Sequence, residues 1–132
     1  MKKILLLSSL IAFHCAAENS QALTVDRLVP NNFQLAFPND RDIKPLQSDF
    51  ELVNYVLMSN EEGERWAVLT LLNTAGGERV FKQEHLMAIF ADGKRKAPAA
   101  IKLNFSGQEL QTVTVSFGYS KFPILAVNTN QG

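Results

Sequence analysis

The chain has 132 residues, of which 46% are hydrophobic, with 13 basic and 13 acidic side chains. A chain of this length forms one domain with a hydrophobic core of ordinary size, and a second domain does not fit. The balanced charge excludes the strongly basic surface that is typical of nucleic-acid-binding proteins, so we expect no nucleic-acid partner.

The first 22 residues are typical of a bacterial secretory signal peptide. Lys2 and Lys3 precede an apolar run over 4–13, and small residues follow it. An apolar run of about ten residues is too short to cross a bilayer as a helix, which argues against a permanent membrane span. We expect cleavage after Ala22, with Ala17 as the alternative site.

Removal of residues 1–22 leaves one domain over 23–132, in the periplasm or outside the cell. Cys15 is the only cysteine of the chain. It is preceded by His14, whereas small residues precede the lipidated cysteine of bacterial lipoproteins, so we expect no lipid anchor. Without Cys15 the mature domain has no thiol, which excludes disulfides, thiolate metal sites and a cysteine nucleophile.

Short apolar runs separated by turn residues, at intervals of about ten, predict an all-β domain of seven or eight strands. The lead-in over 23–30 is expected to be an edge strand or an ordered approach, and 94–98, with its charges and a proline, an edge segment. The other expected strands cover 33–37, 50–59, 64–72, 78–81, 85–91, 101–105, 112–117 and 122–127.

The stretch 50–59 also has apolar residues at helical spacing. A strand is favoured because Tyr55 and Val56 suit a pleated surface and the turn over 60–63 suits a hairpin. The next stretch, 64–72, is apolar at both even and odd positions, which predicts a central strand with both faces covered. Trp66 is accordingly expected in the core, and Trp66→Ala to cost about 3 to 5 kcal/mol.

These strands predict an antiparallel β-sandwich. Its general plan resembles the immunoglobulin-like sandwich, in which a Trp on a central strand is buried, although the cysteine pair of that plan is absent here. A small β-barrel is the alternative, because alternation of apolar residues does not show whether a sheet closes.

Few residues suggest catalysis. His85 is the only histidine expected in the mature domain, and no second His or Cys is available to share a metal. Gly76 and Gly77 do not belong to a phosphate-binding loop, because the Lys of such a loop is missing. They are expected instead in a turn that needs positive φ. The acidic residues do not have the spacing of a calcium-binding loop; they are Asp40, Asp42, Glu61, Glu62 and Glu64. We therefore expect no catalytic residues, no metal and no cofactor.

Two turns contain the candidate binding residues. Lys94, Arg95 and Lys96 form the densest positive patch, suited to an anionic glycan, lipopolysaccharide or an acidic protein, or else to a charged edge that prevents aggregation. Tyr119 and Lys121 belong to the second turn, beside Phe122, where aromatic rings suit sugar stacking or a protein contact. The alternative places Phe122 in the core and Tyr119 over a loop.

The function that fits these expectations is that of an exported, non-catalytic interaction domain whose partner is a protein or glycan of the cell envelope. One alternative is a carboxylate-dependent hydrolase or an inhibitor-like periplasmic protein, which requires two acids to meet in space. Another alternative is an accessory subunit of a surface assembly.

Overall fold

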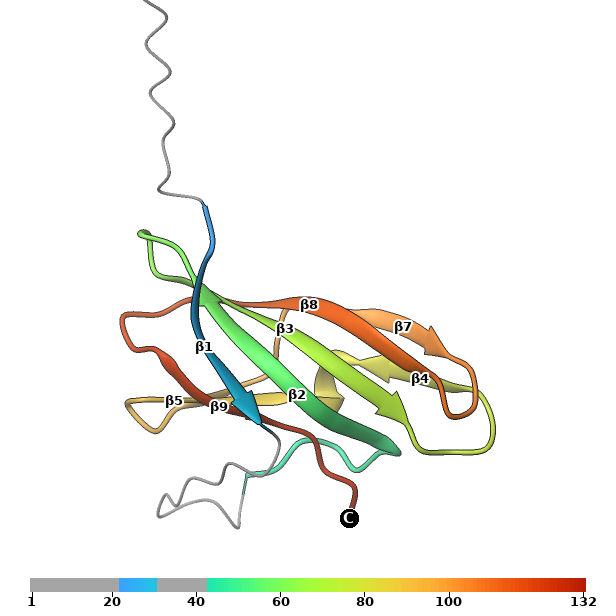
Figure 1. The fold of residues 1–132 in the computed structure, drawn as a ribbon. Coiled ribbons are helices and arrows are strands. Elements are labelled where there is room, and N and C mark those ends of the chain that lie inside the picture. Colours follow the sequence, from blue (N-terminus) through green and yellow to red (C-terminus); the bar gives the residue numbers. More distant parts are fainter. Residues whose placement is uncertain (1–21, 31–42) are drawn as a thin grey trace, which may run out of the picture.

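The computed structural model describes residues 22–30 and 43–132, although not the side chains of 27–30 (Figure 1). Within these ranges the chain is all-β, with one short 3-10 helix, Gln83–His85. The predicted strand over 33–37, the residues Asp40 and Asp42, and most of the predicted signal peptide lie outside the described residues. No helix among the described residues is long and apolar enough to span a membrane.

The strands follow the predicted pattern closely, and 50–59 is a strand with the predicted bounds rather than a helix. The strands of the described residues are β1 (Thr24–Pro30), β2 (Phe50–Ser59), β3 (Glu64–Asn73), β4 (Arg79–Lys82), β5 (Met87–Phe90), β6 (Arg95–Lys96), β7 (Lys102–Phe105), β8 (Leu110–Tyr119) and β9 (Ile124–Asn128).

These strands form three antiparallel sheets. One sheet has four strands in the order β1-β2-β3-β8, so β3 is central, as predicted. The others are β4-β7 and β6-β5-β9. In Figure 1 the four-stranded sheet forms one layer and the shorter sheets lie behind it. None of these sheets closes on itself within the described part of the chain, so the alternative of a small barrel is wrong.

The core lies between the four-stranded sheet and the shorter sheets. On β3 the odd positions Ala67, Leu69 and Leu71 are fully buried. The Phe50 ring from β2 makes edge contacts with two rings of the opposite layer, with centroid distances of 5.1 Å to Phe81 and 5.0 Å to Phe105. Such edge-to-face geometry favours aromatic pairs beyond the area that they bury. This aromatic cluster therefore joins the layers.

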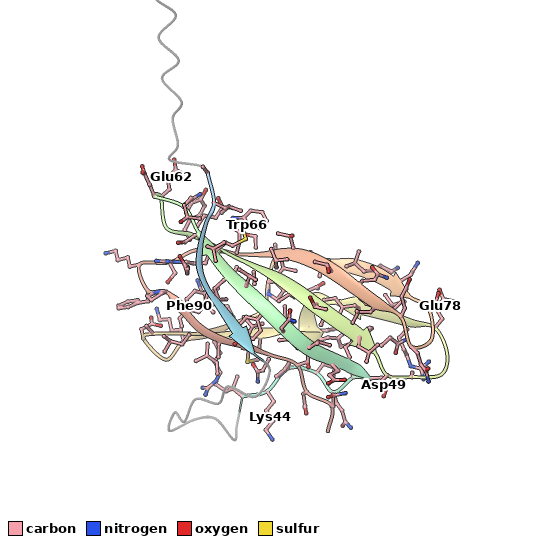
Figure 2. All side chains as sticks on the ribbon, in the orientation of Figure 1. Lys44, Asp49, Glu62, Trp66, Glu78 and Phe90 are labelled. Carbon is pink, nitrogen blue, oxygen red and sulfur yellow. The ribbon has the colours of Figure 1, made fainter. Side chains whose placement is uncertain are left out.

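The even positions of β3 lie on the outer face of the sheet and are only partly buried. Trp66, labelled in Figure 2, is one of them, so its predicted place in the core is wrong. It stands opposite Met58 of β2 and Ser116 of β8. Its Nε1 atom is buried, yet it has no hydrogen-bond partner among the described residues. Among the described residues, cross-strand neighbours rather than a second layer cover this face of β3.

The β3–β4 turn meets the β7–β8 turn at one end of the domain (Figure 1). Gly76 and Gly77 do not have positive φ, so the predicted backbone requirement at these positions is wrong. The glycine requirement lies instead at Gly107, where an added Cβ would collide with the Gly76 carbonyl group. The N–H of Gln108 donates to the Ala75 carbonyl at 3.0 Å, which holds the turns together.

Candidate functional site

The first turn of the candidate site is the β5–β6 hairpin. Asp92 and Gly93 form its tip, and Gly93 has φ of 84°, a conformation that glycine adopts at no steric cost. The Asp92 Oδ1 atom accepts a hydrogen bond from the Lys94 N–H at 3.1 Å, and the Phe90 N–H donates to the Lys94 carbonyl at 2.9 Å. The sequence therefore closes this hairpin with its lysines directly after the tip.

The second turn joins β8 to β9. The Ser120 Oγ atom accepts a hydrogen bond from the Phe122 N–H at 3.1 Å. The Ala91 N–H donates to the Pro123 carbonyl at 2.9 Å, and β5 pairs with β9 up to the position where Phe90 faces Ile124. This pairing places the second turn beside the first, although about thirty residues separate them in the sequence.

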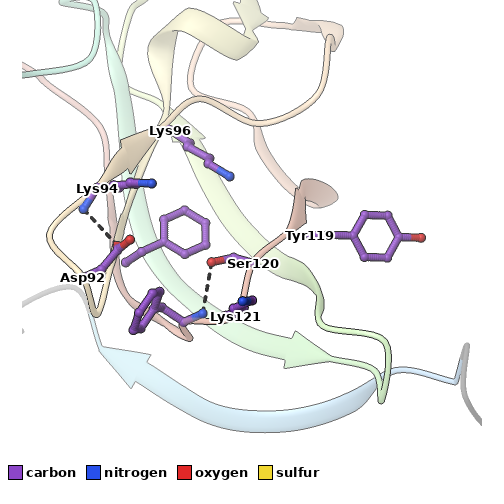
Figure 3. Close-up of a pocket in the computed structure, with 8 residues that line it drawn as sticks. Asp92, Lys94, Lys96, Tyr119, Ser120 and Lys121 are labelled. Carbon is purple, nitrogen blue, oxygen red and sulfur yellow. Dashed lines mark hydrogen bonds between the residues drawn. The ribbon is translucent and has the colours of Figure 1, made fainter.

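A hollow of about 230 Å³, called here the basic hollow, lies between these turns (Figure 3). Figure 3 shows Lys94 and Lys96 extending from the β5–β6 hairpin toward the second turn, with Ser120 facing them. The residues that line the basic hollow are Phe90, Asp92, Lys94, Lys96, Tyr119, Ser120, Lys121 and Phe122. Three lysines and one aspartate thus line a small concave surface.

The floor of the basic hollow is aromatic. Phe90 is buried, and the Lys96 Nζ atom lies 5.2 Å from the centroid of its ring. A cation over the face of an aromatic ring is attracted by the ring's quadrupole. This contact holds one of the cations of the hollow in place.

Four of the five predicted binding residues line the basic hollow, namely Lys94, Lys96, Tyr119 and Lys121. Arg95 is not among its lining residues; it lies on β6 and pairs with Ile89. Sequence reasoning missed Ser120, which had no signal beyond its place in a turn.

The aromatic residues of the second turn are exposed. Phe122 is 46% exposed, so its alternative placement in the core is wrong. Tyr119 is 62% exposed, and Figure 3 shows its ring directed away from Lys94 and Lys96. Tyr119 therefore borders the basic hollow, while its ring lies on the opposite side of the turn.

On that opposite side lies a second, more open hollow of about 490 Å³. Glu61 and Glu62 line it, together with Arg65 and the turn from Tyr119 to Lys121. The negative charge of Glu64 is the main cause that raises the pKa of Tyr119. Desolvation and the negative charge of Glu62 act in the same direction. This second hollow therefore combines carboxylates with the cations of Arg65 and Lys121.

Arg65 of β3 fixes the backbone between the two hollows. Its Nε and Nη2 atoms both donate to the Ser120 carbonyl at 3.2 Å. A second contact, from the Ser120 N–H to the Gly63 carbonyl at 3.0 Å, ties the same residue to the β2–β3 turn. Ser120 is therefore held from the four-stranded sheet as well as from its own turn.

His85 lies elsewhere and has structural partners. Its Nδ1 atom accepts a hydrogen bond from the Lys82 N–H at 3.0 Å. The ring packs against Phe50 and Phe81, with centroid distances of 5.7 Å and 5.9 Å. Burial against these rings lowers the pKa of His85; the nearby Lys82 charge acts in the same direction, and Glu84 opposes it. These contacts indicate a structural role for His85, which holds the backbone at the end of β4.

The described residues contain no group of three or more His, Cys, Asp or Glu side chains placed to hold a metal ion. Comparisons of the chain with protein-family models, with curated proteins and with solved structures found no match. The basic hollow is thus identified by its own geometry and charge.

Proposed function

We propose that this chain is an exported, non-catalytic interaction domain with an immunoglobulin-like β-sandwich plan, and that it binds a protein or glycan of the cell envelope through the basic hollow. The observation that supports it is the convergence of two distant turns. The pairing of β5 with β9 brings Lys94 and Lys96 next to Lys121 around one concave surface. A concave site with a few convergent polar groups is typical of binding sites.

The exposed aromatic residues of the same turn add to this proposal. Phe122 is exposed at the rim of the hollow, and the exposed ring of Tyr119 lies on the opposite side of the same turn. Aromatic residues are enriched where proteins make contacts with their partners. Export is proposed from the signal-peptide pattern at the N-terminus.

The test of binding is capture from an envelope extract of the source cells, with the full chain expressed in those cells and purified from them. A Lys94/Lys96/Lys121→Ala variant removes the cations of the basic hollow. A Lys44/Lys82/Lys102→Ala variant removes the same charge from exposed positions elsewhere and serves as the matched control.

We expect one specific protein or glycan to be retained by the wild type and by the control, and lost by the hollow variant. Retention that falls equally in both variants would reflect total charge alone and would contradict the proposal. Export is tested on the same material, since the purified chain should begin at Leu23. A chain that still begins at Met1 and stays in the cytoplasm would refute export.

A further inference from the structure

We infer that the basic hollow binds a phosphate ester, carried by a sugar or by a lipid headgroup. This inference rests on the proposed function, because it names the ligand chemistry of the same site. Its basis is the number and kind of charged groups, the free donor of Ser120 and the size of the hollow.

The charged side chains favour a compact, multiply charged anion. Lys94, Lys96 and Lys121 supply the cations of the hollow, against the carboxylate of Asp92. An ammonium group is a compact point charge with three donors and binds phosphate as such, whereas the planar arginine fork binds carboxylate or phosphate in a bidentate manner. Arg95, although adjacent in sequence, is not among the lining residues. Several lysines around one point therefore suit a tetrahedral phosphate.

Ser120 provides a neutral donor at the same place. Its Oγ atom already accepts the Phe122 N–H. A hydroxyl group both donates and accepts, so the O–H hydrogen remains for an acceptor in the hollow. Figure 3 shows Ser120 facing the side where the lysines converge. A phosphate oxygen there would accept from the hydroxyl and from an ammonium group.

The size of the hollow limits the group that enters it. Its volume of about 230 Å³ lies below the roughly 300 to 1,000 Å³ of sites that enclose a whole small molecule. A phosphate and the first atoms of its ester fill such a space. The rest of the ligand must leave over the rim, where the exposed ring of Phe122 offers an apolar surface.

The experiment measures binding of glucose 6-phosphate, glucose, inorganic phosphate and phosphatidate vesicles to the full chain by calorimetry and co-sedimentation. We expect glucose 6-phosphate or phosphatidate to bind and glucose not to bind. The stronger of these two ligands identifies a sugar or a lipid source. Binding should weaken as salt rises from about 0.05 M to about 0.5 M, because exposed charges are screened.

Single Lys94→Ala and Lys121→Ala variants should each weaken binding about 2- to 5-fold, as for exposed ion pairs. Asp92→Asn should strengthen binding by a similar factor, about 2- to 5-fold. Asn keeps the acceptor for the Lys94 N–H and removes the only carboxylate among the described residues that line the hollow. These opposite signs separate an electrostatic site from a loss of folding, which would weaken binding in every variant.

Glucose binding as tightly as its phosphate, or weaker binding by Asp92→Asn in a folded variant, would overturn the inference. So would equal phosphate binding by the wild type and the Lys94/Lys96/Lys121→Ala variant. If no phosphate ester binds while the envelope partner is still captured through the hollow, the inference fails and the proposed function stands. If neither occurs, both fail.

Discussion

The hydroxyl group of Tyr55 on β2 accepts a hydrogen bond from the Val127 N–H on β9 at 3.0 Å, and both residues are buried. This contact joins the four-stranded sheet to the β6-β5-β9 sheet. It also pairs the buried Val127 N–H, which would otherwise lack this acceptor in the core, where an unpaired polar group is costly.

Removal of this hydroxyl group should destabilise the domain. Tyr55→Phe keeps the ring but leaves the Val127 N–H without this acceptor, and we expect a loss of about 1 to 3 kcal/mol in the free energy of unfolding. Urea denaturation measures it. Tyr119→Phe, at an exposed position, should change stability by less than about 0.5 kcal/mol. Equal effects of the two changes would contradict the structural role of Tyr55.

The position of Trp66 revises the cost of its removal. Because Trp66 is only partly buried on the outer face of β3, Trp66→Ala should cost about 2 kcal/mol, less than the 3 to 5 kcal/mol of a fully buried aromatic residue. Phe81, which is fully buried, should show that larger cost when changed to Ala. Chemical denaturation of both variants compares them. A cost for Trp66→Ala equal to that for Phe81→Ala would place Trp66 in the core after all.

The contact between Gly107 and Gly76 predicts a sharp difference between two glycine substitutions. Gly107→Ala should destabilise the domain by about 1 to 3 kcal/mol, because its Cβ would collide with the Gly76 carbonyl group. Gly76→Ala meets no atom within 4 Å and should be neutral within about 0.5 kcal/mol. Thermal unfolding of the two variants provides the measurement, and equal midpoints would disprove the close approach of these turns.

The lowered pKa of His85 predicts a loss of stability in acid. Burial against aromatic rings favours the neutral imidazole in the folded state, so the folded-state pKa lies below the ordinary value of 6.5. The contribution of the neutral His85 ring to the free energy of unfolding is therefore fully present above pH 6.5. It is lost as the pH falls through the folded-state pKa. The effect is small because the ring is only partly buried.

Urea denaturation of the wild type and of His85→Gln over this pH range tests the assignment. Gln does not titrate, so the stability of the wild type relative to the variant should decrease toward acid pH. A constant difference between the two proteins would show that His85 does not contribute to the pH dependence.

Local pattern was sufficient to predict most strands. On β8, Val113, Val115 and Phe117 alternate with hydroxyl side chains and are buried as expected, because a strand directs successive side chains to opposite faces. The same rule failed at Trp66, since an apolar residue on an outer face has the same pattern as one under a second layer. Only the neighbouring strands decide between these cases.

The residue types of the candidate site could be predicted from the sequence, but their arrangement in space could not. Lys94, Lys96 and Lys121 belong to two separate turns, and the sequence of neither turn indicates that the three side chains line one hollow. Their proximity depends on the pairing of β5 with β9, a long-range contact. Ser120 was missed for the same reason, because its place beside the lysines exists only in the folded chain.

The turn from Tyr119 to Lys121 separates the basic hollow from the hollow lined by Glu61 and Glu62. A ligand long enough to cross this ridge meets an excess of positive charge beside Lys94 and, beyond the ridge, a surface where Arg65 and Lys121 balance the two carboxylates. The two ends of such a ligand are therefore not interchangeable, and its anionic end belongs beside Lys94. A uniformly anionic chain would gain attraction on one side of the ridge only.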